Sequence, residues 1–112
     1  MLGNGGNDLF VIFGDDANGI YGDDSIVGGG GGIDVAAYRR DPSAVVVNLS
    51  AVNVVVNGAD VGLGGSVTVA GGTALDGYRV NTSLATASQA QRTDALVGIN
   101  ASEGSSFNDT LV

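Results

Sequence analysis

The stretch Gly3–Tyr38, GNGGNDLFVIFGDDANGIYGDDSIVGGGGGIDVAAY, decides how this chain folds. A triplet of Gly, then Asn or Asp, then Asp begins at positions 6, 14 and 22, and a looser Gly-Ile-Asp begins at 32. Short apolar runs stand at 9–13, 20–21, 26–27 and 35–38. Gly-Asn and Gly-Asp pairs mark tight turns, and apolar runs of this length suit strands and are too short for helices. The pattern predicts a turn followed by a short strand, repeated.

A strand and turn of this size cannot bury its own apolar face, so we expect the copies to stack on one another. Stacking gathers negative charge, because the first 34 residues hold six Asp and no Lys or Arg. Two like charges about 4 Å apart repel by roughly 4 kcal/mol at an effective dielectric constant of 20. A hard divalent cation between the turns would relieve this repulsion, and calcium accepts carboxylate and main-chain carbonyl oxygens in flexible geometry.

The glycine turns resemble the nonapeptide Gly-Gly-x-Gly-x-Asp-x-apolar-x of the repeats-in-toxin family, also called haemolysin-type calcium-binding repeats. The clearest copies are residues 3–11, 19–27 and 29–37, and a further copy closes the chain at 104–112. The resemblance implies an all-β fold, a right-handed parallel β-roll, which is a form of β-solenoid. In such a roll each coil holds two nonapeptides, about eighteen residues, and calcium lies in the turns between successive coils.

The resemblance also implies which residues hold calcium, namely the Asp and the leading Gly of each triplet and the Asp of the last copy. These residues are Asp8, Asp16, Asp24, Asp34, Gly6, Gly14, Gly22, Gly32 and Asp109. Aspartates one coil apart are expected to share an ion. Asp16 and Asp34, eighteen positions apart, are the first pair, and Asp8 and Asp24, sixteen apart, are the second. The triplets are spaced by eight, eight and ten residues, where the family repeats at nine.

Three acidic side chains can each be interpreted in two ways. Asp15 and Asp23 precede the expected ligands, and either their carbonyl groups bind calcium or they are ordinary solvated turn acids. Asp109 fits the motif, but the nearest aspartate that could be its partner, Asp94, is fifteen residues away. A solvated turn is the alternative for that residue.

The chain after residue 40 departs from the regular repeat. We expect a single domain over 1–112, with calcium-binding repeats at 1–40, an irregular β-rich insertion or cap at 41–92 and a returning repeat-like segment at 93–112. Val-rich runs predict strands and Gly-rich pairs predict turns within the insertion. The expected strands are 44–49, 52–56 and 66–70, and the expected turns are 57–60 and 71–72. Residues 79–92, rich in Ser, Thr, Ala and Gln, predict an inserted loop.

Composition excludes several classes of function. The net charge of −8 argues against nucleic-acid binding and against attraction to anionic membranes, and no apolar run is long enough to span a bilayer. The chain has no Cys and no His, so the common thiol nucleophile and general base are absent. We therefore expect no enzyme; a catalytic cleft would need Asp76, Tyr78 and Arg79. Arg39 and Arg40 are expected on the surface, opposing the acidic turns.

The sequence thus predicts a calcium-binding structural module of a secreted bacterial protein, which folds on calcium outside the cell. The resemblance implies export by the type I route and further domains of a parent polypeptide. The alternative is a carbohydrate-binding or adhesive accessory module, in which residues 50–92 would bind a polysaccharide.

Overall fold

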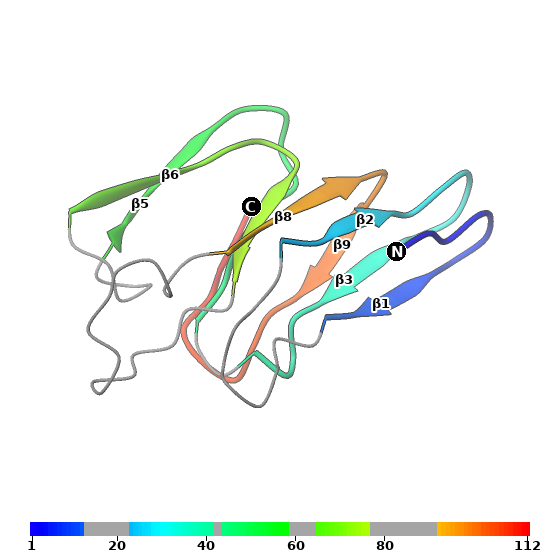
Figure 1. The fold of residues 1–112 in the computed structure, drawn as a ribbon, viewed down its shortest axis with the longest axis horizontal. Coiled ribbons are helices and arrows are strands. Elements are labelled where there is room, and N and C mark those ends of the chain that lie inside the picture. Colours follow the sequence, from blue (N-terminus) through cyan, green and yellow to red (C-terminus); the bar gives the residue numbers. More distant parts are fainter. Residues whose placement is uncertain (13–22, 42–43, 59–64, 77–91) are drawn as a thin grey trace.

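The computed structural model describes residues 1–12, 23–41, 44–58, 65–76 and 92–112 (Figure 1), and in these residues it contains strands and no α-helix. The predicted all-β class is therefore confirmed. The strands are β1 (Leu9–Val11), β2 (Ser25–Val27), β3 (Val35–Ala37), β4 (Val46–Asn48), β5 (Val54–Asn57), β6 (Ser66–Val69), β7 (Thr73–Asp76), β8 (Arg92–Val97), β9 (Ala101–Glu103) and β10 (Thr110–Leu111).

The strands form two sheets and a hairpin. A three-stranded sheet has the order β1-β3-β9 and is parallel throughout, and a five-stranded sheet has the order β10-β4-β7-β8-β2. The five-stranded sheet is mixed, because β7 runs antiparallel to both β4 and β8. Strands β5 and β6 pair with each other only, as an antiparallel hairpin. A parallel β-roll is not confirmed, since the larger sheet is mixed and no sheet closes on itself.

Parallel stacking is nevertheless present at the N-terminal side, with a longer coil than the sequence predicts. Leu9 pairs with Val35, so successive stacked positions are 35 − 9 = 26 residues apart. The reason is that β1 and β2 belong to different sheets, and thirteen residues, 12–24, connect them. That connection is longer than a nonapeptide repeat leaves for a turn. The expected spacing of about eighteen residues is therefore wrong for this pair of corners.

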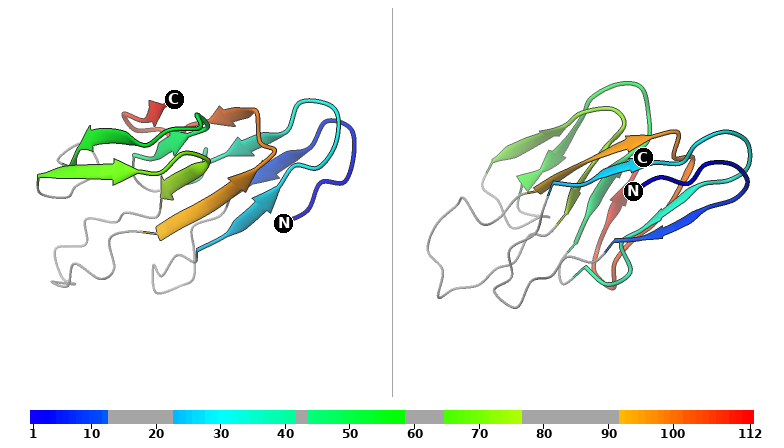
Figure 2. Two further views of the ribbon diagram at one scale, coloured as in Figure 1. Left: turned by 90° about the horizontal axis from the view of Figure 1, so that it is seen from above. Right: turned by 45° about the vertical axis from the view of Figure 1, so that its right-hand side comes forward.

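Two apolar clusters hold together the layers of strands, whose arrangement is shown in Figure 2. Side chains alternate along a strand, so Val45 and Val47 of the β4 region face one way and Val46 faces the other. The first pair joins a cluster between the two sheets that includes Ile26 and Tyr38. Val46 joins a second cluster, between the five-stranded sheet and the β5–β6 hairpin. The β5–β6 hairpin therefore adds a third layer, whereas β4 and β7 of the same inserted segment belong to the five-stranded sheet and contribute to the space between the two sheets.

Candidate metal centre

Three glycine-rich turns lie side by side at one end of the two sheets and form what we call the glycine corners, residues 3–8, 28–34 and 98–100 (Figure 1). Main-chain hydrogen bonds join each corner to the next. The amide of Gly3 donates to the carbonyl of Val27 at 2.9 Å, and the amide of Gly28 donates to Val97 at 2.9 Å. The corners therefore stack at main-chain contact distance, which is the arrangement that the glycine pattern predicted.

Glycine is required where the corners touch. Gly29 has a φ of +105°, and an added Cβ would overlap the main chain of Asn4. Gly32 has a φ of +110°, and an added Cβ would overlap the carbonyl group of Gly6. Any larger residue at these positions would both strain the backbone and push the stacked corner away. Within the run of five glycines at 28–32, Gly29 and Gly32 thus have a direct steric cause, whereas a Cβ on Gly30 would meet nothing within 4 Å.

Carboxylate and amide side chains at the corners accept main-chain hydrogen bonds from the neighbouring turn. The amide of Asp8 donates to Oδ1 of Asp34 at 3.0 Å, and the amide of Asp34 donates to Oδ1 of Asn100 at 2.7 Å. Each of these residues directly precedes a strand of the parallel sheet, so parallel pairing aligns them in one row. Asp8 consequently meets Asp34, and the predicted pairing of Asp8 with Asp24 is not formed, because β1 and β2 belong to different sheets.

A second set of oxygen atoms gathers beside the corner glycines. Oδ2 of Asp8 is buried and has no hydrogen-bond partner. This atom and the carbonyl oxygen of Gly28 both lie where a Cβ on Gly3 would be. At Gly28, Oδ2 of Asp34 and the carbonyl oxygen of Gly98 are each 2.5 Å from the position of an added Cβ. Carboxylate and carbonyl oxygens are the ligand types that calcium takes in proteins.

The donor chemistry of the corners therefore fits calcium, and the number of side-chain ligands is small. Within the described part of the chain, no group of three or more Asp, Glu, His or Cys is arranged to hold a metal ion. A corner offers the carboxylates of Asp8 and Asp34, of which Asp34 already accepts one hydrogen bond. The remaining ligands of an ion held there would be main-chain carbonyl groups and water.

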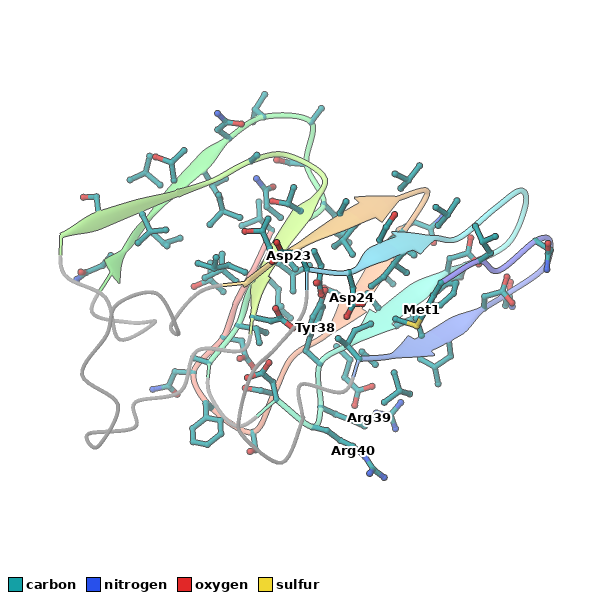
Figure 3. The ribbon with its side chains drawn as sticks, viewed as in Figure 1. Met1, Asp23, Asp24, Tyr38, Arg39 and Arg40 are labelled. Carbon is teal, nitrogen blue, oxygen red and sulfur yellow. The ribbon has the colours of Figure 1, made fainter. Side chains whose placement is uncertain are left out.

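A second group of acidic residues lies between the sheets, away from the corners. The side chain of Asp94 is fully buried, and both of its oxygens accept hydrogen bonds. The amide of Asp24 donates to Oδ1 at 2.8 Å, and the Tyr38 hydroxyl donates to Oδ2 at 2.9 Å. Figure 3 shows Asp24 and Tyr38 close together where β2 begins. Asp23 is exposed beside them, and its Oδ1 accepts the amide of Thr93.

Asp76 completes this group, which we call the interior acidic group: Asp76, Asp94 and Asp24, with the Tyr38 hydroxyl. Asp76 is only 3% exposed, and its Oδ1 is buried without a hydrogen-bond partner. Burial, with additional repulsion from Asp94, Asp41, Asp24 and Asp23, raises the pKa of Asp76 to about 8.

Asp94 and Tyr38, the other two buried members of the interior acidic group, also have raised pKa values. Burial raises the pKa of Asp94 to about 6, and the hydrogen bonds from the Asp24 amide and the Tyr38 hydroxyl oppose that rise. Burial, followed by the charge of Asp94, raises the pKa of Tyr38 far above its ordinary value. The Tyr38 hydroxyl therefore stays protonated and serves as a hydrogen-bond donor.

The last glycine turn holds its aspartate in a similar way, without a second acid. Oδ1 of Asp109 accepts the amide of Val45 at 2.9 Å and the Ser105 hydroxyl at 2.6 Å. Its Oδ2 lies where a Cβ on Gly104 would be. Asp94 is not its partner, because Asp94 is engaged with Asp24 and Tyr38. In this turn the carboxylate stabilises the backbone, and the role of Asp109 in calcium binding stays a prediction.

Several predicted residues lie outside the described residues: Gly14, Asp15, Asp16, Gly22, Tyr78 and Arg79. The pairing of Asp16 with Asp34 therefore stays a prediction. Arg39 forms an ion pair with Glu103 at 3.3 Å, so its partner is an acid of β9 and not an acid of the glycine turns.

Sequence reasoning did not name Asn100 as a site residue, and it named Asp76 only for a catalytic cleft and Asp94 only as a possible partner of Asp109. The signal for Asn100 was its place immediately before β9, which matches Asp8 before β1 and Asp34 before β3. An Asp or Asn at the start of each short strand is thus a better guide than the spacing of the triplets. Asp94 carries the same signal, because it precedes Ala95, which pairs in parallel with Ser25, and it accepts the Asp24 amide. Asp76 lies on the antiparallel β7–β8 pair and carries no such signal.

Comparison of the chain with protein-family models, with curated proteins and with solved structures finds no match. In the described segments, no helix has the length and apolar character needed to cross a membrane.

Proposed function

We propose that this chain is a calcium-binding structural module in which calcium closes the stacked glycine corners. The observation that carries the proposal is the juxtaposition of Asp8 and Asp34 in adjacent corners, with Oδ2 of Asp8 buried and unpartnered. A buried carboxylate oxygen without a partner costs free energy, on the order of 1–3 kcal/mol or more for a charged group. A bound cation would remove that cost and the repulsion between the two acids.

The neutral residue in the same row supports a role for the negative charge. Asn100 accepts the amide of Asp34 just as Asp34 accepts the amide of Asp8. An uncharged side chain is therefore sufficient for the hydrogen bond that holds the corners together. The charges of Asp8 and Asp34 add repulsion and are not needed for that hydrogen bond. A cation bound between them would turn this repulsion into attraction.

The wider setting follows from the same proposal. The module acts outside the cell in a secreted bacterial protein, exported by the type I route, and belongs to the parallel β-roll type. Low calcium inside the cell leaves the acidic corners open through repulsion, and higher calcium outside closes them, so metal binding contributes folding free energy. The module itself is non-catalytic. The alternative, a polysaccharide-binding surface on residues 50–92, stays a prediction, because the structure describes only part of that segment.

Calcium titration followed by circular dichroism and calorimetry tests the proposal. We expect a gain of β signal and a rise in melting temperature with calcium, and a much weaker response to magnesium, which demands octahedral geometry and keeps its water. The variant Asp34→Asn keeps a side-chain acceptor for the Asp8 amide and removes one charge, so it should lower calcium affinity about tenfold. Glu103→Gln is the matched control, because it removes one exposed charge outside the corners. Equal calcium affinity in the two variants would refute the proposal.

A further inference from the structure

We infer that the interior acidic group is a second site for a hard divalent cation, with Asp76 and Asp94 as its carboxylate ligands and Asp24 at its rim. This inference goes beyond the corner site, because its two carboxylate ligands lie on β7 and β8, outside the glycine repeats and at the opposite end of β2 from the corners. It would stand even if the glycine corners bound no metal.

Strand pairing places the two carboxylates within reach of one ion. Asp94 is opposite Ala74 in the β7–β8 register, and Asp76 is two residues further along β7. Side chains two apart on a strand share a face, so Asp76 and Asp94 are diagonal neighbours on the face toward the second sheet. Such neighbours are about 7–8 Å apart at their Cα atoms. Two carboxylate groups can span that distance with a shared ion, since calcium binds oxygen at about 2.3–2.6 Å.

Asp76 is the residue that points to a ligand. Both carboxylate oxygens of Asp94 accept hydrogen bonds, one from the Asp24 amide and one from the Tyr38 hydroxyl. Oδ1 of Asp76, in contrast, is buried and accepts no hydrogen bond. An unpartnered carboxylate in a 3% exposed position is costly, and proteins compensate it with a proton or with a cation. Asp94, Asp24 and Asp23 all add negative potential at this place, which stabilises positive charge bound beside Asp76, a metal ion as well as a proton.

The available donors define the class of ion. Carboxylate and phenolic oxygens surround the site, and the chain has no Cys and no His. Oxygen donors suit calcium and related hard cations and do not select zinc or copper. Asp23 and Asp24 are exposed at the edge of the group, so their charges can attract the ion from solvent.

Terbium luminescence tests the inference directly. Terbium(III) replaces calcium at oxygen sites, and it emits strongly when an excited tyrosine ring is close. The chain has three Tyr and no Trp, so a Tyr21→Phe/Tyr78→Phe background leaves Tyr38 as the only sensitiser. We expect calcium-displaceable terbium emission in this background. Asp76→Asn should reduce the apparent terbium affinity about tenfold or more, as expected for the loss of one charged ligand.

Two matched variants separate the interior acidic group from the corners. Asp34→Asn should leave the Tyr38-sensitised emission unchanged while weakening the calorimetric corner site. Tyr38→Phe removes the sensitiser and the hydrogen bond to Oδ2 of Asp94, so it should abolish the emission and change the calcium affinity that calorimetry measures. An Asp76→Asn protein that retains full emission and full affinity would overturn the inference, since Asp76 would then be satisfied by a proton. Loss of calcium binding in Asp34→Asn alone, with no emission in the background protein, would support the corners and refute the interior acidic group.

Discussion

The two ends of the space between the sheets each combine one aspartate that accepts a main-chain amide with one that has an unpartnered oxygen. At the glycine corners, Asp34 accepts the Asp8 amide from the neighbouring parallel turn, whereas Oδ2 of Asp8 is buried without a partner. At the interior acidic group, Asp94 accepts the Asp24 amide across the parallel β2–β8 pair, whereas Oδ1 of Asp76, at the end of an antiparallel strand, accepts no hydrogen bond. The ends differ in burial, because Asp8 is half-buried and Asp76 is only 3% exposed. The unpartnered oxygen of Asp76 is therefore the costlier of the two.

The largest expected effect comes from breaking the stack of corners at Gly29. Gly29→Ala introduces a Cβ at a φ of +105° and overlaps the Asn4 main chain, so we expect a loss of more than about 4 kcal/mol in unfolding free energy. Gly6→Ala is the matched control, because its φ of +102° is similar but nothing lies within 4 Å of an added Cβ. It should cost only about 1–2 kcal/mol. Urea denaturation in calcium measures both, and equal losses would show that contact between corners contributes nothing.

The second largest effect on stability is expected for a substitution of Asp76 in the interior acidic group. Without calcium, folded Asp76 has a pKa of about 8 and is mainly protonated at pH 7, whereas the unfolded chain releases that proton. Holding the proton costs free energy, and Asp76→Asn is neutral without it, so we expect the variant to be more stable by about 2–4 kcal/mol at pH 7. Denaturation in a calcium chelator measures this change. A destabilised variant would mean that the Asp76 charge already has a favourable partner.

The same residue gives the calcium-free protein a pH dependence of known sign. Asp76 has a folded pKa of about 8 and an ordinary value of 3.8, so the folded state keeps a proton that the unfolded state releases between these values. The contribution of Asp76 to stability is fully present below about pH 4 and is lost as the pH rises toward 8. The slope approaches about 1.4 kcal/mol per pH unit for one group. In the Asp76→Asn variant, a plot of unfolding free energy against pH should lose the decline between about pH 6 and 8, while the decline that Asp94 contributes up to about pH 6 remains. An unchanged decline between pH 6 and 8 would show that Asp76 is not its source.

The parts of the fold built from parallel strands could be predicted from the sequence better than the antiparallel parts. The glycine turns, the strands after Asp8 and Asp34 and the stacking of the corners were predicted correctly, because local glycine and aspartate patterns determine them. The spacing of a coil was wrong, because the length of a connection between sheets leaves no periodic signal. The burial of Asp76 was missed for a related reason. It depends on antiparallel pairing between β7 and β8, which are separated by residues 77–91.

A smaller effect is expected for the hydrogen bond between adjacent corners. Asp34→Ala removes the acceptor of the Asp8 amide, and leaving that amide unpaired should cost about 1–3 kcal/mol. Asp34→Asn keeps an acceptor, as Asn100 does naturally, and should stay within about 0.5 kcal/mol of the wild type in a calcium chelator. Chemical denaturation of the two variants side by side measures the difference. If Asn is as damaging as Ala without calcium, the charge itself is part of the contact, and the argument from Asn100 fails.

The smallest effect on stability is expected for the surface ion pair between Arg39 and Glu103. Arg39 and Glu103 pair at 3.3 Å, but both side chains are about half exposed, at 44% and 50%. Exposed ion pairs contribute little, because water and salt screen the attraction and two long side chains lose freedom. Arg39→Ala should therefore change the unfolding free energy by less than about 0.5 kcal/mol, and high salt should reduce even that. A loss comparable with that of Asp34→Ala would mean that the edge between β3 and β9 depends on charge, and that cations other than a metal ion balance part of the acidity of this chain.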